Sequence, residues 1–290
     1  MSASDADICE PVGSSASPVW AGVPMFVHAR STPVRQVGLH IPVPTLVLWK
    51  SGQTDVDLRG SAGKGWRFQG RARRFDLYPA SEFSKASTGA GAFSQLAIPL
   101  HSEFLHSMLR RTDAELGLTQ PRFQFSDAVL ERLARGLMNH AREGRELGHI
   151  YTQSLSVAMV DRLAELASGP TARTRATSPL SGRSRKLIID LIEETLGNDL
   201  RLQDLAALSG RRISDFLRAF RQSFGISPHQ YVLERRIGRG KRLLRGDKSL
   251  TDIAIELGFA SQANFGAAFK TRTGMTPGTF RRDNAAPGTT

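Results

Sequence analysis

The chain has 290 residues, and its 39 Lys and Arg against 27 Asp and Glu give a formal net charge of +12. The length suffices for two domains with cores of their own, and the single cysteine, Cys9, excludes an internal disulfide and a cysteine-based zinc site. Apolar runs stay well short of the ~20 residues of a membrane span, and residues 1–17 lack the basic start and apolar core of a secretory signal, so we expect a soluble cytoplasmic protein.

The N-terminal half changes from polar to β-type to helical along the chain. Residues 1–18 are small, polar and acidic, which predicts a disordered tail. Short β-type runs separated by Gly, Ser and Pro clusters follow between about Val23 and Pro99, as in a sandwich or barrel. The runs are 25–28, 45–49, 56–58, 66–68 and 75–79, with 96–99 as a last candidate. Helical patterns then cover about 102–111, 126–142 and 149–168.

The C-terminal part is basic and helical. Residues 169–182 are rich in Thr, Ala, Arg, Ser and Pro, which predicts an interdomain linker, and a helix is expected over about 183–196. From Ser181 onward there are 19 Lys and Arg and 11 Asp and Glu, a net charge of +8. Most of the positive excess therefore lies in this segment, as expected of a protein that binds the phosphate backbone of DNA, although a solvated basic surface is the plain alternative.

Residues 253–274 predict a helix, a glycine turn and a second helix. Gly258 stands where a turn needs a left-handed backbone, and Ser261 is a candidate N-cap for the helix that carries Phe265 and Phe269. Gly274 is expected to end that helix, and a following proline prevents its continuation. The same plan occurs 49 positions earlier, where the matching residues are Phe216, Phe220, Gly225 and Pro228. Two tandem helix-turn-helix units are therefore predicted.

The duplicated unit closely resembles the DNA-binding domain of the AraC/XylS family of bacterial transcription regulators, over about 181–282. The resemblance implies an α+β multidomain protein with a β-rich, cupin-like sensor or dimerisation domain at 19–168 and a linker at 169–182. It also implies an all-α AraC-type DNA-binding domain at 183–283, in which a linker helix joins two helix-turn-helix units. Over 23–168 the resemblance rests on the order of elements and the stretch 75–79.

The linker helix, expected over 231–245, departs from the family at Gly238 and Gly240. A glycine in a helix interior costs about 1 kcal/mol relative to alanine. We therefore expect a weaker or bent linker and a less fixed placement of the two units.

The first recognition helix is expected over 213–224. Its Ser214, Leu217 and Arg218 match base-facing positions of the family, and Arg221 lies on the same exposed face. Arg218 is the best candidate because a guanidinium reads guanine O6 and N7 bidentately, the alternative being a phosphate- or solvent-facing arginine. Arg211 and Arg212 oppose the helix dipole at its start, so either phosphates compensate them or Ser214 or Ser209 caps the helix instead.

The second recognition helix carries weaker candidates. Gln262 can pair with adenine or can simply face solvent, and Ala267 stands where the family often has an arginine. We expect this helix to read fewer bases than the first, with Lys270, Arg272, Arg281 and Arg282 positioning the protein on the backbone. The complete set of predicted DNA contacts is Arg212, Ser214, Leu217, Arg218, Arg221, Ser261, Gln262, Ala263, Ala267, Lys270 and Arg281.

Signals for catalysis are weak. No two of the seven histidines have the i,i+2 or i,i+4 spacing of a metal pair, and no nucleophile or phosphate-loop motif is present, so neither an enzyme nor a cofactor is predicted. Trp49, Trp66, Phe68 and Tyr78, with Phe75, either line an effector pocket or pack as core.

The sequence therefore predicts a sequence-specific DNA-binding transcriptional regulator that reads two adjacent major-groove segments. The resemblance implies an activator that contacts RNA polymerase, with repression left open, and a small-molecule effector or a homodimer. The alternatives are a cupin-type metalloenzyme or small-molecule-binding protein with a DNA-binding appendage, and an interaction protein that has lost DNA binding.

Overall fold

A computed structural model of the chain describes residues 8–11, 23–30, 33–60, 63–101, 109, 111–143, 149–168, 178–198 and 200–284. The chain divides into two compact units. The first contains residues 1–144 and 155–173, and the second contains residues 145–154 and 174–290. The two units are described separately below.

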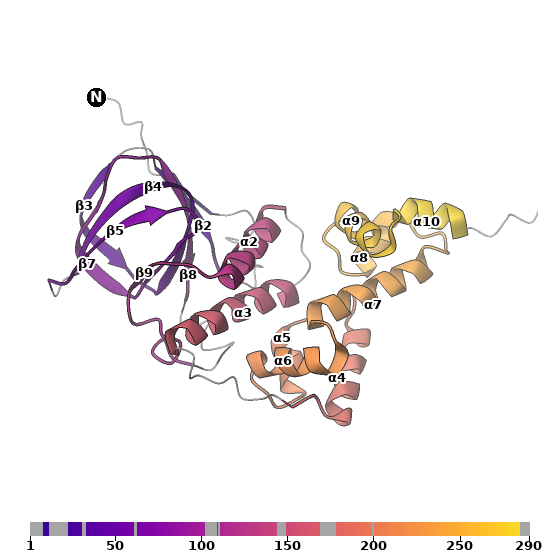
Figure 1. Ribbon diagram of the computed structural model, residues 1–290. Coiled ribbons are helices and arrows are strands. Elements are labelled where there is room, and N and C mark those ends of the chain that lie inside the picture. The colour runs from indigo at the N-terminus through magenta and orange to yellow at the C-terminus, as the bar shows by residue number, and fades with distance from the viewer. Residues whose placement is uncertain are drawn as a thin grey trace, which may run out of the picture. The chain divides into compact units, whose positions relative to one another are not determined.

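The first unit is built on an antiparallel sheet that curves into a barrel (Figure 1). One path through the sheet has the order β1-β2-β8-β4-β6-β9, while β5 and β7 pair with β4, and β3 pairs with β7. The strands are β1 (Ile8–Pro11), β2 (Phe26–Arg30), β3 (Val34–Ile41), β4 (Thr45–Gly60), β5 (Gly65–Arg71), β6 (Phe75–Tyr78), β7 (Ser81–Thr88), β8 (Phe93–Pro99) and β9 (Arg122–Phe125).

Strand β4 is the backbone of this barrel and differs from the prediction of two strands at 45–49 and 56–58. It is one strand of 16 residues. Its first half pairs with β8 and β6, and its second half pairs with β5 and β7. The polar residues between the two apolar runs read as a loop, yet they stay in the ladder, with an irregularity between Trp49 and Ser51. The prediction was wrong because the strand passes from one pair of neighbours to another without turning back.

Other N-terminal expectations fared differently. The tail over 1–18 was predicted to be disordered, but Ile8–Pro11 forms β1 and pairs with β2, so backbone pairing overrides the polar composition there. The strands β3, β7 and β9 were not predicted, because their apolar and polar residues do not alternate cleanly. The rest of the tail, most of the helix expected at 102–111 and most of the linker expected at 169–182 lie outside the described residues.

The barrel core follows from side-chain alternation on the strands. Leu46, Leu48, Phe75, Leu96 and Ile98 are fully buried. Two helices belong with the sheet in sequence, α2 (Ala128–Glu143) and α3 (His149–Ser168), and both agree closely with the predicted helices.

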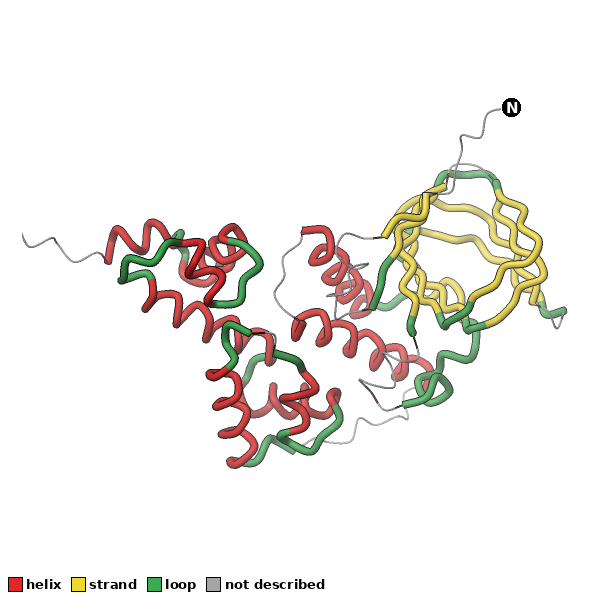
Figure 2. The backbone as a smooth tube through the Cα atoms, turned by 180° about the vertical axis from the view of Figure 1, so that it is seen from behind, coloured by secondary structure: helices red, strands yellow, loops and turns green. Residues whose placement is uncertain are grey.

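The second unit is all-helical. Its helices are α4 (Gly182–Glu194), α5 (Leu202–Ala207), α6 (Ile213–Phe224), α7 (Pro228–Leu243), α8 (Leu250–Glu256), α9 (Gln262–Thr273) and α10 (Pro277–Asn284). Helices α4, α5 and α6 gather at one end of α7, and α8, α9 and α10 gather at the other, as both views show (Figures 1 and 2). The α5–α6 pair and the α8–α9 pair thus lie on either side of a connecting helix.

Local signals placed these helices well. Helix α6 has the predicted bounds. Helix α9 begins after Ser261, whose side chain accepts a hydrogen bond from the Asn264 amide, and it ends at Gly274 in the left-handed conformation, as predicted. The proline after that turn starts a further helix, α10, which the sequence analysis did not predict.

The predicted core phenylalanines are buried in both pairs. Phe216 and Phe220 are fully buried beneath α6, and Phe265 and Phe269 are fully buried beneath α9. Burying the apolar face of each helix leaves its opposite face for solvent or for a partner.

Helix α7 is continuous and well capped, unlike the weak linker we expected. Ser227 and Gln230 form a capping box at its start. A Cβ atom on Gly240 would lie 3.1 Å from side-chain atoms of Leu257 and Phe265, so the glycine lets α7 approach the α8–α9 pair closely. The two glycines therefore differ in role, because a Cβ on Gly238 would meet nothing within 4 Å.

This difference predicts opposite behaviour for two substitutions. Gly238→Ala should raise the free energy of unfolding of the helical unit by about 1 kcal/mol, because alanine is the better helix former at an exposed position. Gly240→Ala should gain nothing or destabilise, because its Cβ would crowd Leu257 and Phe265. Denaturant unfolding followed by far-ultraviolet circular dichroism measures both, and equal stabilisation by the two variants would contradict the packing role of Gly240.

Candidate nucleic-acid interface and barrel cavity

The exposed face of α6 carries the residues predicted to touch bases. Ser214, Leu217 and Arg218 are partly exposed and Arg221 is exposed, whereas Phe216 and Phe220 face the core. The amphipathic spacing of the helix produces this division, because residues three and four apart share one face.

Arg218 is held by a neighbour on the same helix. Its Nη2 lies 2.6 Å from Oδ1 of Asp215, one turn earlier, and the two side chains are 39% and 41% exposed. An ion pair this exposed adds little stability. Its consequence is positional, because it restricts the rotamers of the guanidinium on the exposed face of α6.

The start of α6 corrects one of the alternatives above. Arg212 is the N-cap residue and makes no side-chain cap bond. Ser209 does not cap the helix, because its hydroxyl donates to the carbonyl of Ala206 at 2.8 Å, and Ser214 already lies inside the helix. Arg211 is not at the interface either, since its guanidinium donates to the carbonyl oxygens of Ser178 and Pro179 at 2.7 and 3.2 Å. Compensation of Arg212 by phosphates stays a prediction.

Helix α9 presents a smaller and less charged set. Ser261 is committed to capping, with its Oγ 3.2 Å from the Asn264 amide nitrogen. Gln262 is exposed, and its Oε1 accepts a hydrogen bond from Thr251 on α8 at 3.0 Å. Ala263 and Lys270 are exposed and Ala267 is partly buried. The few polar groups are in keeping with the expectation that α9 reads fewer bases than α6.

Arg281 has a structural contact that the sequence did not reveal. It is partly buried on α10, and its Nη2 donates to the carbonyl of Lys248 at 2.6 Å, which ties α10 to the segment before α8. Arg272 and Arg282 are exposed, and Arg272 lies 3.5 Å from Glu234 on α7. Lys270 is therefore a better test of a purely positioning contact than Arg281.

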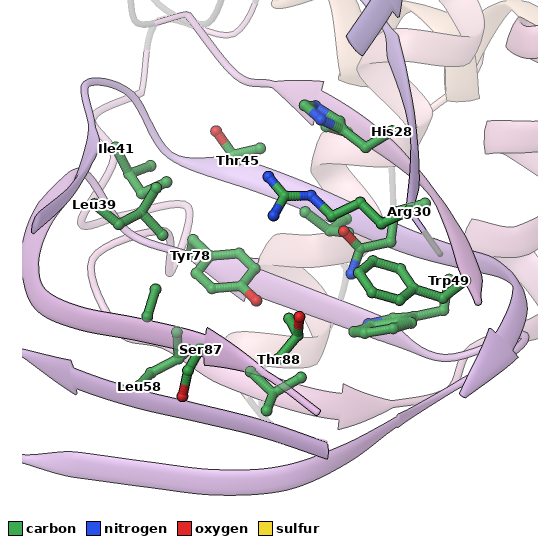
Figure 3. Close-up of a pocket in the computed structure, with 16 residues that line it drawn as sticks. His28, Arg30, Leu39, Ile41, Thr45, Trp49, Leu58, Tyr78, Ser87 and Thr88 are labelled. Carbon is green, nitrogen blue, oxygen red and sulfur yellow. The ribbon is translucent and has the colours of Figure 1, made fainter. Parts of the chain in front are cut away.

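The barrel encloses a cavity of about 250 Å³ (Figure 3). Of the aromatic residues singled out above, Trp49 and Tyr78 line it. Trp66 and Phe68 instead pack around Phe123, with ring centroids 5.9 and 4.7 Å away. Phe75 is fully buried and stacks on Phe125 at 5.7 Å.

A buried carboxyl group behind Trp49 fixes this wall of the cavity. Asp76 is fully buried and accepts hydrogen bonds from Trp49 Nε1 at 2.7 Å and from the amide and Nε2 of Gln124 at 2.7 and 3.0 Å. Burial raises the pKa of Asp76 to about 6, against the lowering effect of these hydrogen bonds. The sequence stretch 75–79 was noted above, but nothing in it marks Asp76 as buried.

Two absences hold for the part of the chain that the structure describes. No cluster of three or more His, Cys, Asp or Glu side chains is placed to hold a metal ion there. None of its helices is long and apolar enough to cross a membrane.

Comparison with known proteins places the helical unit among transcription regulators. A helix-turn-helix domain family matches residues 205–283. The HTH-type transcriptional regulator ExsA of Pseudomonas aeruginosa is 28% identical over 194 residues, covering 64% of this chain and 69% of that protein. The virulence regulon transcriptional activator VirF of Yersinia enterocolitica is 29% identical over 196 residues, covering 64% and 71%. A solved AraC-type regulator structure from Chromobacterium violaceum is 29% identical, with coverage of 36% of this chain and 95% of that one and a TM-score of 0.34.

The environment of Asp76 predicts a pH dependence of barrel stability. Its pKa is about 6 in the folded state against 3.8 for an ordinary aspartate, so folding takes up a proton between these values. The free energy of unfolding should therefore fall as the pH rises through this window, by on the order of 3 kcal/mol in total. Denaturant unfolding at a series of pH values, followed by tryptophan fluorescence, measures it, because all three tryptophans precede residue 67.

Asp76→Asn is the matched control, because an amide does not titrate. Its free energy of unfolding relative to the unsubstituted chain should rise between pH 4 and 6. A constant difference across that range would show that Asp76 is ionised throughout.

Proposed function

We infer from its membership of the AraC/XylS family of transcriptional regulators that this chain contacts DNA with the exposed faces of α6 and α9. The chain is a DNA-binding transcriptional regulator. The observation that carries the proposal is the matched helix-turn-helix domain at 205–283, in which two helix pairs flank one connecting helix.

Each helix pair acts, in this proposal, as a helix-turn-helix unit, and the two units read adjacent major-groove segments. The second helix of each pair enters the groove, because its buried face packs on its own unit and its other face is accessible. On α6 the contacts are Arg212, Ser214, Leu217, Arg218 and Arg221; on α9 and beyond they are Ser261, Gln262, Ala263, Ala267, Lys270 and Arg281. Their polar and basic character supports this assignment.

The N-terminal part, residues 19–168, is proposed to be a cupin-like sensor and dimerisation domain, followed by a linker at 169–182 and a DNA-binding domain at 183–283. The barrel-shaped sheet and its cavity support a small-molecule effector site there. We further propose a cytoplasmic activator that contacts RNA polymerase and forms homodimers. The name of the Yersinia enterocolitica relative, a transcriptional activator, supports the direction of regulation.

Binding should be specific and salt-dependent. A preferred duplex can be selected from a random pool with the full-length protein, and its affinity measured against a scrambled duplex. The logarithm of the binding constant should fall linearly with the logarithm of salt concentration, by about 0.9 per phosphate neutralised. Equal affinity for the preferred and scrambled duplexes at every salt concentration would refute sequence-specific binding.

Arg218 and Lys270 should differ as a reader and a positioner. If Arg218 pairs with a guanine, Arg218→Ala should cost about 1–3 kcal/mol and relax the preference at one base pair. Lys270→Ala should weaken binding to all sequences by a similar factor and reduce the salt slope by about one unit. Titrations on the preferred site and its single-base variants, at several salt concentrations, separate the two effects.

Asp215→Asn provides a matched control for orientation. It keeps the shape of the side chain but removes the charge that holds the Arg218 guanidinium at 2.6 Å. The preference at the same base pair should relax in this variant too. If Arg218→Ala shifts all affinities together and leaves the ranking of base variants intact, Arg218 contacts phosphate.

A further inference from the structure

The wall of the barrel cavity combines an apolar surface with a localised positive charge. Most of the sixteen lining side chains are apolar, among them Leu39, Ile41, Val47, Val56 and Leu58. The charged member is Arg30, and no Asp or Glu is found among the residues that line this cavity. The cavity is therefore apolar in most directions and cationic in one.

The register of two strands places the polar groups together. Strands β2 and β8 are antiparallel, with His28 opposite Gln95 and Arg30 opposite Phe93. Because side chains alternate along a strand, His28 and Arg30 share one face, and both line the cavity together with Gln95. Figure 3 shows the Arg30 side chain reaching across the cavity toward Thr45 and Tyr78, with His28 on the same strand.

The aromatic wall offers ring faces and withholds its polar edge. The Trp49 indole N–H donates to Asp76 at 2.7 Å, away from the lining set, which does not include Asp76. The Trp49 ring lies against Phe93 with centroids 5.2 Å apart. A ligand in contact with these two residues therefore meets an apolar surface, which suits a hydrocarbon or aromatic body.

A guanidinium facing such a wall favours an anion of low charge. Arginine binds carboxylates through two parallel N–H···O bonds, and such charge-assisted bonds are stronger in a poorly hydrated site. A single lining arginine balances one negative charge, so a monoanion fits this cavity better than a phosphate dianion, which would bring a second charge into an apolar space.

We propose that the barrel cavity binds a small amphipathic carboxylic acid, with its carboxylate on Arg30 and its apolar body against Trp49 and Phe93. His28 and Gln95, on the same patch of wall, supply further hydrogen bonds to the carboxylate. The proposal names the chemical class of the effector and so rests on the effector site of the proposed function.

The test uses the full-length protein and two matched pairs of probes in isothermal titration calorimetry. The probes are phenylacetate and hexanoate, each against its uncharged primary amide. Each acid should bind at least about tenfold more tightly than its amide, because the amide cannot form the charge-assisted pair. Arg30→Gln should abolish that difference while leaving amide binding unchanged, and Arg59→Gln, an exposed arginine of β4 outside the cavity, should leave both unchanged.

The comparison of acid with amide does not depend on the folding of any variant. Amides that bind as tightly as acids, or an absence of binding by both acids up to about 10 mM, a very weak affinity, overturns the proposal. So does an Arg30→Gln variant that folds and keeps the full preference for acids. DNA-binding titrations with and without the acid are scored separately. Acid binding without any effect on DNA affinity refutes the effector function and leaves the anion site standing, whereas an effect caused only by neutral compounds does the reverse.

Discussion

The architecture of the helical unit depends on one buried cation. The guanidinium of Arg236, on α7, is 6% exposed and donates to the carbonyl oxygens of Leu196 at 2.8 Å and Gly258 at 3.0 Å. A buried charge is tolerated only where fixed dipoles replace its water, so these carbonyls must stay in place. One belongs to the segment after α4 and the other to the turn between α8 and α9. A Cβ atom at Gly258 would lie 2.9 Å from both Arg236 Nη2 and the carbonyl oxygen of Gly197, which is why the turn has no side chain there.

The arginine makes the two helix pairs one object. Helix α7 starts with a capping box, meets the α8–α9 pair at Gly240, and is tied to that pair's turn by Arg236. The separation of α6 and α9 is therefore set by a helix and not by a loop. In the proposed function, the spacing of the two DNA segments becomes a property of the fold, and specificity then depends on the few side chains on each exposed face.

The sequence predicted what local signals specify. Helix α6 and the ends of α9 follow from caps, apolar spacing and a terminal glycine, all within a few residues of one another. The continuity of β4, the strands β3, β7 and β9, and β1 depend on partners far along the chain, which no local pattern reveals. The same holds for the site. The exposed residues of α6 were predictable, but the Arg218–Asp215 contact, the role of Arg281 and the position of Arg30 in the cavity require the tertiary structure.

The length of β4 has a consequence for how the barrel opens. Four neighbours, β5, β6, β7 and β8, are hydrogen-bonded to this one strand. No part of the sheet that contains it can detach without breaking a ladder of β4, so the strands should exchange their amide protons together, through cooperative opening of the sheet. A molecule that enters the cavity must consequently pass between strand ends and loops, because parting the wall itself would cost the stability of the whole barrel.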